Sequence, residues 1–260
     1  MAVDGWNWED PGRLNPIMDD FTAGLAVADT LELLVTAPYP ARRLAELGIT
    51  GIEFAAFKTT HPCGLGADLV GLRAPGGATE AGHLYRVDGA CYFTQLDIGE
   101  PLPFADGALE WVYAEHLIEH VPLPTAVSWL TEVRRVLAPG GLLRLTTPDL
   151  RKYVEGYLSG DKFFARHRRR VDLAIGVAPA MPARNAFMFN QIFYLYGHRW
   201  LYDLQELQYV LGQAGFAVEG GEAVQLRGFR TGLRPDVAEL DQTIRNDETI
   251  YVEVVRSNGT

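Results

Sequence analysis

Cysteine, cationic charge and long apolar runs are all scarce in this sequence of 260 residues. Its two cysteines, Cys63 and Cys91, are too few for a disulfide framework, so we expect two reduced thiols. No apolar run approaches the roughly 20 residues that a transmembrane helix needs. Residues 1–16 have neither the basic start nor the apolar stretch of a signal peptide. We therefore expect a cytoplasmic protein that does not enter a membrane.

Basic residues are outnumbered by acidic ones, 23 to 33, which gives a formal net charge of −10. Broad binding of nucleic acid needs a positive surface, so this balance argues against it. One exception is the basic run at residues 165–170, ARHRRR, which is either a solvated helix face or a docking site for an anionic substrate. We expect a small-molecule substrate and no nucleic acid, and the sequence leaves the oligomeric state open.

Short apolar runs alternate with amphipathic stretches along most of the chain. Strands are predicted at residues 51–57, 66–72, 92–98, 109–114, 142–146, 218–225 and 249–255. Helices are predicted near residues 19–28, 41–47, 125–137 and 203–214. Strands that alternate with helices indicate a parallel sheet with crossover connections. Residues 1–50 are interpreted as an N-terminal extension and 51–260 as the main domain, in which the aromatic-rich segment 150–202 is an insertion that covers the active site.

An H-x-x-E-H string occupies residues 116–120, and this pattern is known from inverted zinc peptidases. Such a site needs both histidines on one continuous helix, together with a third ligand. Here Pro122 and Pro124 follow almost at once, and Pro122 biases Val121 away from helical geometry. The string also follows an apolar strand directly, which places His116 where open α/β sheets bind their ligands. We therefore predict no metal at His116 and His120.

A different context explains the string better. Residues 97–120, DIGEPLPFADGALEWVYAEHLIEH, continue into EVRRVLAPGGLLRLTTPDL and later into YGHRWLYD at 196–203. This order of motifs resembles a branch of the class I S-adenosylmethionine-dependent methyltransferases, and it covers much of the chain in separated blocks. The resemblance, taken with the alternation of strands and helices, predicts an α/β, Rossmann-like, doubly wound sheet of seven strands. It would be mostly parallel, with one antiparallel strand.

The resemblance also implies a cofactor, S-adenosylmethionine, and a set of site residues. Asp97 would accept from the exocyclic amine of adenine, with the backbone N–H of Ile98 beside it, although Asp97 also suits an Asx turn. His116 and His198 are the candidate bases, each with a structural hydrogen-bonding or packing role as the alternative. The remaining candidate cofactor residues are Thr59, Thr60, Asp68, Tyr113 and Glu115.

The glycine-rich loop that this family carries after its first strand is not matched. Phe57-Lys58-Thr59 stands where glycines are expected, and Asp68 is the only candidate for the acid that binds the ribose, about two residues early. A bulky Phe57 or a charged Lys58 would obstruct the approach of the backbone to the cofactor. Two hypotheses follow: a methyltransferase with a rebuilt loop, or a protein of the same fold that has lost the cofactor and acts as a partner protein or a non-methylating enzyme.

Overall fold

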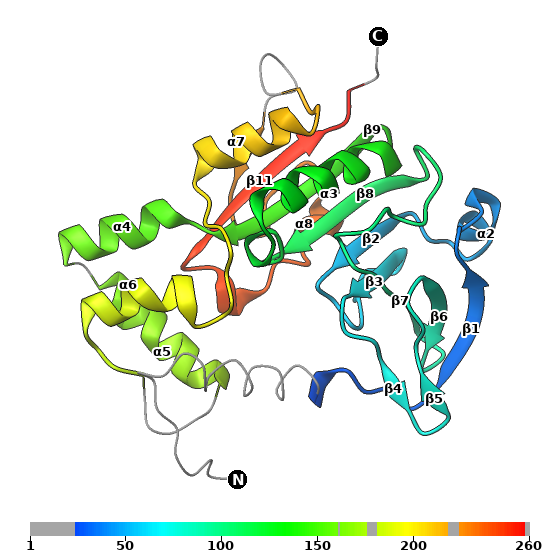
Figure 1. The fold of residues 1–260 in the computed structure, drawn as a ribbon, viewed down its shortest axis with the longest axis horizontal. Helices are drawn as coiled ribbons and strands as arrows, with labels where there is room; N and C mark the ends of the chain where they lie inside the picture. The colour runs from blue at the N-terminus through cyan, green and yellow to red at the C-terminus, as the bar shows by residue number, and fades with distance from the viewer. Residues whose placement is uncertain (1–23, 161, 176–180, 218–223, 258–260) are drawn as a thin grey trace.

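The computed structural model describes residues 24–160, 162–175, 181–217 and 224–257 (Figure 1). Its strands are β1 Leu31–Thr36, β2 Gly51–Phe54, β3 Gly64–Asp68, β4 Arg73–Ala74, β5 Gly77–Ala78, β6 His83–Val87, β7 Cys91–Gln95, β8 Leu109–Glu115, β9 Leu137–Pro148, β10 Gln225–Arg227 and β11 Thr249–Val255. Its helices are α2 Ala41–Glu46, η1 Ile118–His120, α3 Leu123–Val136, α4 Leu150–Ser159, α5 Phe163–Ile175, α6 Asn185–Tyr194, α7 Leu204–Gln213, α8 Pro235–Ala238 and η3 Thr243–Arg245. None of the helices in these ranges is long and apolar enough to cross a membrane.

One sheet organises the molecule, with the strand order β1-β6-β7-β3-β2-β8-β9-β11-β10. Strands β7, β3, β2, β8 and β9 are parallel neighbours, and β11 runs antiparallel to β9. The predicted Rossmann-like class is therefore confirmed. The sheet has nine strands rather than seven, because β6 pairs antiparallel with β7 and β1 extends that edge. β1 lies within the predicted N-terminal extension, and residues 19–23 and 218–223 of two predicted elements lie outside the described part of the chain.

The two faces of the sheet are covered in different ways. Helices α2, α3 and α7 bury their apolar side chains on one face, where Leu44, Leu130 and Leu207 join one cluster with strand residues such as Val112. The other face receives the short α8, whose Val237 packs against Trp111 and Tyr113 of β8. In Figure 1, α3 and α7 lie over the half of the sheet formed by β8, β9 and β11.

No helix connects β2 to β3 in this fully described part of the chain. Residues 55–63 instead return along the sheet to the start of β3. Gly66 permits the close approach, because a Cβ there would sit 2.8 Å from the carbonyl oxygen of Ala56 and 3.4 Å from the nitrogen of Thr59. The crossover helix expected of a parallel pair is thus replaced by a short return segment, residues 55–63.

Helices α4, α5 and α6 form a lobe beside the sheet (Figure 1). They share their own apolar cluster: Tyr153, Phe163, Phe164, Val171, Met181, Met188, Ile192 and Leu195. The hydroxyl of Tyr153 donates to Glu248, which precedes β11, so this lobe is tied to the edge of the sheet. The lobe falls within residues 150–202, and its predicted role as a cover for the active site stays a prediction.

Candidate functional site

The carboxyl ends of four parallel strands meet at one edge of the sheet. β2 ends at Phe54, β3 at Asp68, β7 at Gln95 and β8 at Glu115. Phe54 is in register with Ala67 of β3 and with Ala114 of β8, so these ends are level. Open α/β sheets bind their ligands in the crevice outside such ends. Of the residues predicted from the sequence, Asp68 and Glu115 end two of these strands, and Asp97 and His116 follow the ends of β7 and β8.

The loop after β2 keeps one feature of a glycine-rich turn. Ala55 has φ of +58°, which lies in the left-handed region that favours glycine. The next residue, Ala56, donates its N–H to the carbonyl of Ala67 at 3.1 Å, so the chain stays against β3 as it turns back. The left-handed residue of this turn is thus Ala55, which precedes the residues 57–59 where the glycines were expected.

Ala55→Gly should raise the free energy of unfolding by about 0.5–1 kcal/mol, because glycine removes the steric cost of a left-handed alanine. The matched control is Ala56→Gly, since Ala56 is not among the described residues with positive φ. That variant should lose stability through the greater entropy of its unfolded chain. Chemical denaturation of both variants measures the difference, and equal effects at the two positions would contradict the assignment of strain to Ala55.

Phe57 and Lys58 are both held by other parts of the protein. Phe57 packs toward Phe93 of β7, with their ring centroids 6.3 Å apart. Lys58 pairs with Asp88 at 2.7 Å, and the ammonium group lowers the pKa of that carboxyl. Thr59 is buried in the return segment, whereas Thr60 is exposed. The two residues expected to obstruct a cofactor are thus engaged with β7 and with the loop after β6.

Glu53, which the sequence analysis missed, is a buried carboxylate of β2. Its side chain is close to the Thr59 hydroxyl and to Glu115, and its Oε2 has no hydrogen-bond partner among the described residues. Burial raises the pKa of Glu53 to about 7, and burial likewise raises the pKa of Glu115 to about 7. Glu115 accepts the N–H of Gln242 on Oε1, while its Oε2 is also without a partner. The sequence signal that could have identified Glu53 is the presence of an acidic residue inside the apolar run GIEF.

Asp97 and Asp68 both close turns beyond their strands. Asp97 accepts the N–H of Gly99 at 2.8 Å, which is the Asx turn considered as its alternative role, and its side chain is exposed. The adjacent Ile98 is buried. Asp68 accepts the N–H of Val70 at 2.9 Å, and burial raises its pKa. Both carboxylates lie at the carboxyl edge of the sheet, where the sequence analysis placed them.

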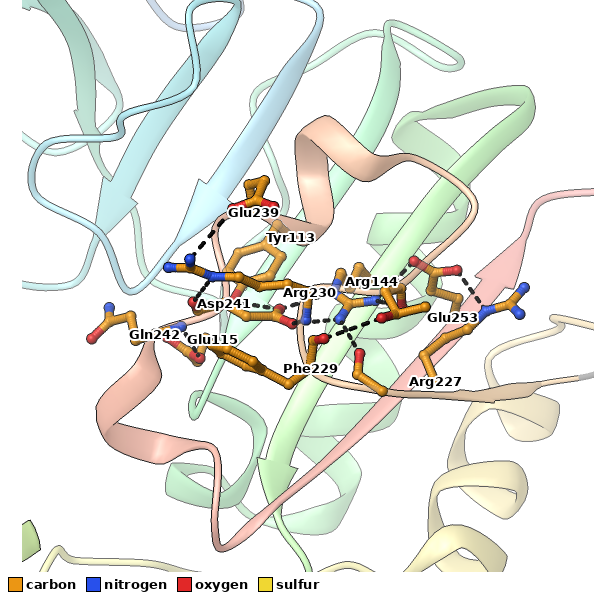
Figure 2. A network of polar contacts seen from close by, with 12 residues as sticks. Tyr113, Glu115, Arg144, Arg227, Phe229, Arg230, Glu239, Asp241, Gln242 and Glu253 are labelled. Atoms are coloured by element: carbon orange, nitrogen blue, oxygen red, sulfur yellow. Dashed lines mark hydrogen bonds and ion pairs between the residues drawn. The ribbon is translucent and has the colours of Figure 1, made fainter.

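Tyr113 does not face that edge. Its hydroxyl donates to Asp241 at 3.3 Å, inside a buried ionic network on the α8 face of the sheet (Figure 2). Arg144 of β9 stands at the centre of this network, 2.5 Å from Asp241 and 2.9 Å from Glu253. All three charged side chains have zero exposure. The network holds residues 228–241 against the sheet. The local sequence around Arg144 contains no pattern that predicts it.

His116 is held by two neighbours at the end of β8. The hydroxyl of Thr249 donates to the carbonyl of Arg245 at 2.6 Å, so Nε2 of His116 donates to that hydroxyl oxygen at 2.7 Å. Nδ1 then faces Oε1 of Glu119 at 3.5 Å. Burial lowers the pKa of His116 well below its ordinary value. His116 is therefore a neutral, oriented side chain with a weak tendency to take up a proton.

His198 reaches the H-x-x-E-H turn from a distant part of the sequence. The backbone N–H groups of Arg199 and Trp200 donate to the carbonyl of Glu119 at 2.7 and 3.2 Å. This places the ring of His198 edge-to-face with that of His120, with 4.8 Å between centroids. Burial lowers the pKa of His198 to about 3. The second candidate base thus lies beside His120 and Glu119.

Comparisons with known proteins find similarity to methyltransferases. Residues 49–145 match the family model described as a methyltransferase domain. A probable methyltransferase, ltbC, of Aspergillus luteorubrus is 28% identical over 123 residues, which are 47% of this chain and 43% of that protein. An uncharacterized methyltransferase of Mycobacterium sp. (strain KMS) is 28% identical over 172 residues, 62% of this chain and 64% of that protein. The chain thus spans between two fifths and two thirds of the length of these relatives.

Among solved structures, an S-adenosylmethionine dependent methyltransferase from Mesorhizobium loti is similar with a TM-score of 0.42 and 16% identity, over 84% of this chain and 98% of that one. The matched residues 49–145 include β2, β3, β7 and β8, whose carboxyl ends form the site described above. Residues 49–145 of this chain are therefore similar to a methyltransferase domain.

Proposed function

We propose that this chain transfers the methyl group of S-adenosylmethionine to a small-molecule acceptor. The observation that carries the proposal is the gathering of Glu53, Asp68, Asp97 and Glu115 at the ends of four adjacent strands. Oε2 of Glu53 and Oε2 of Glu115 are buried and have no hydrogen-bond partner in the described part of the chain. They suit a ligand that brings positive charge, and this cofactor carries an ammonium and a sulfonium group. The residues present therefore fit the cofactor.

Each carboxylate has a distinct task under this proposal. Glu53 and Glu115 would face the cationic methionine end, Asp68 would accept from the ribose hydroxyls, and Asp97 from the adenine amine. The cofactor supplies an already activated methyl group. What remains for the protein is to hold the acceptor atom in line at about 3 Å, which is catalysis by positioning. His116 and His198, with their lowered pKa values, serve orientation better than proton abstraction.

One observation favours the second hypothesis, a protein of this fold that does not use the cofactor. Residues 55–63 form no helix, so the loop after β2 lacks the helix N-terminus that stabilises negative charge in nucleotide-binding sheets. Two contacts support the methyltransferase proposal instead: Phe57 packs against Phe93, and Lys58 is neutralised by Asp88. Neither side chain needs the space beyond the strand ends.

Asp97→Ala should weaken the binding of S-adenosylhomocysteine by about 1–3 kcal/mol, because a charged acceptor for the adenine amine is lost. Isothermal titration calorimetry measures this effect. The matched control is Asp106→Ala, an exposed aspartate that pairs with Arg135 away from the strand ends. It should bind as the unmodified protein does. Equal affinity in the two variants would refute the adenine assignment.

A further inference from the structure

Glu119, His120 and His198 bring two imidazoles and one carboxylate to the same point. One donor atom from each lies within 4.8 Å of the other two. Ligand atoms around a bound zinc ion lie about 2.0–2.2 Å from it, and therefore about 3–4 Å from one another. Metal binding would require the three donors to move closer by side-chain rotation. The sequence analysis considered only His116 and His120, on one helix, and did not pair His120 with His198.

Glu119 supplies an independent indication of a ligand. Its side chain has zero exposure, and Oε1 has no hydrogen-bond partner among the described residues. Oε2 accepts the hydroxyl of Thr147 at 2.9 Å, which fixes the carboxylate in one orientation. A buried acceptor without a donor is costly, and a cation is one of the groups that removes that cost.

The two histidines are oriented as metal ligands usually are. Nδ1 of His198 donates to the carbonyl of Ile192 at 2.5 Å, which leaves Nε2 as its acceptor atom. The His120 ring lies close to the backbone of Tyr196. Metal-binding histidines commonly donate their other ring nitrogen to a carbonyl in this way, which fixes the tautomer and the ring. The backbone bonds from Arg199 and Trp200 to Glu119 hold the two halves of the cluster together.

We propose that Glu119, His120 and His198 bind one divalent transition-metal ion. Two nitrogens and one oxygen suit Zn²⁺ and its neighbours rather than Mg²⁺ or Ca²⁺, which take oxygen ligands. Three protein ligands leave at least one coordination position for water or for an oxygen of a small-molecule ligand. Arg245 is a nearby cation that acts electrostatically on Glu119. Metal binding at this site does not depend on the cofactor, so it can be tested separately from the proposed methyl transfer.

Zinc binding to protein made without a histidine tag and freed of metal by a chelator tests this site. Calorimetric titration with Zn²⁺ should give one ion per chain. His120→Ala and His198→Ala should each weaken that binding at least tenfold, while the far-ultraviolet circular dichroism stays unchanged. The control is His83→Ala, because His83 lies 3.4 Å from Glu80 in a histidine–carboxylate pair elsewhere on the protein.

Glu119→Gln replaces the carboxyl group with an amide, which is a poorer zinc ligand, and should weaken Zn²⁺ binding as well, with its folding checked by thermal unfolding. Because His120 is exposed and His198 partly exposed, their alanine variants are expected to fold even where a change at buried Glu119 does not. The proposal is overturned if the unmodified protein binds no Zn²⁺. It is overturned equally if His120→Ala and His198→Ala bind Zn²⁺ as tightly as His83→Ala does.

Discussion

Replacing Arg144 with methionine is expected to lower the free energy of unfolding by about 3–5 kcal/mol, because it leaves buried carboxylates without their partner. Arg144 contacts Asp241 and Glu253, and all three side chains have zero exposure. Figure 2 shows Arg144 between these two acids. Arg227 still reaches Glu253 at 2.9 Å, so the greater loss falls on Asp241.

The matched control is Arg86→Met, in which the same chemical change breaks an exposed pair. Arg86 meets Glu32 at 2.8 Å with 35% and 60% of the two side chains exposed. Surface pairs of this kind contribute about 0–1 kcal/mol. Urea denaturation of both variants gives the comparison, and a similar small loss in each would show that the buried network does not hold residues 228–241 to the sheet.

Glu53→Gln is expected to make the ligand-free protein more stable at pH 8 than the unmodified chain, by about 3 kcal/mol at most. Burial raises the pKa of Glu53 to about 7 from its model-compound value of 4.5. The folded state then binds more protons than the unfolded state between these two values, so stability falls as the pH rises through that window. Glutamine keeps the shape without the charge, and therefore removes this part of the pH dependence.

Stability curves at pH 4.5 and pH 8 measure the effect as a difference between variant and unmodified protein. The difference is the quantity to compare, because other buried carboxylates such as Glu119, whose pKa burial raises to about 8, contribute equally to both. Glu100→Gln is the control, since its side chain is exposed. If the stability of Glu53→Gln changes with pH in parallel with that of the unmodified protein, burial does not raise the pKa of Glu53 in the folded state.

The core of the sheet could be predicted because its signals are local. Apolar runs such as residues 109–114 and 249–255 became β8 and β11, and the periodic stretch 125–137 became α3 at Leu123–Val136. Strand β6, which pairs with both β1 and β7, was missed because its sequence, HLYRV, contains only a short apolar stretch. The return segment was also missed, since the close approach at Gly66 depends on two strands and a loop together.

The sequence placed several candidate residues at the ends of strands, but it did not predict which side chains contact one another. Asp97 and Asp68 were predicted from the resemblance to the methyltransferases, and the rule that strand ends form the ligand-binding edge placed Glu115 there as well. The direction of Tyr113, by contrast, is set by Asp241, which lies far along the chain and gives no local pattern. The pairing of His120 with His198 likewise depends on backbone bonds from Arg199 and Trp200 to Glu119. Such long-range polar contacts are properties of the folded chain rather than of any short motif.

Titration calorimetry with S-adenosylhomocysteine on the purified, unmodified protein tests the central claim most directly. The proposed function predicts one site per chain at micromolar strength, about −8 kcal/mol. That result requires the space beyond the strand ends to be open, as the packing of Phe57 on Phe93 and the pairing of Lys58 with Asp88 indicate. No heat of binding from either S-adenosylhomocysteine or S-adenosylmethionine would contradict the account, and would favour a protein that kept this fold without its cofactor.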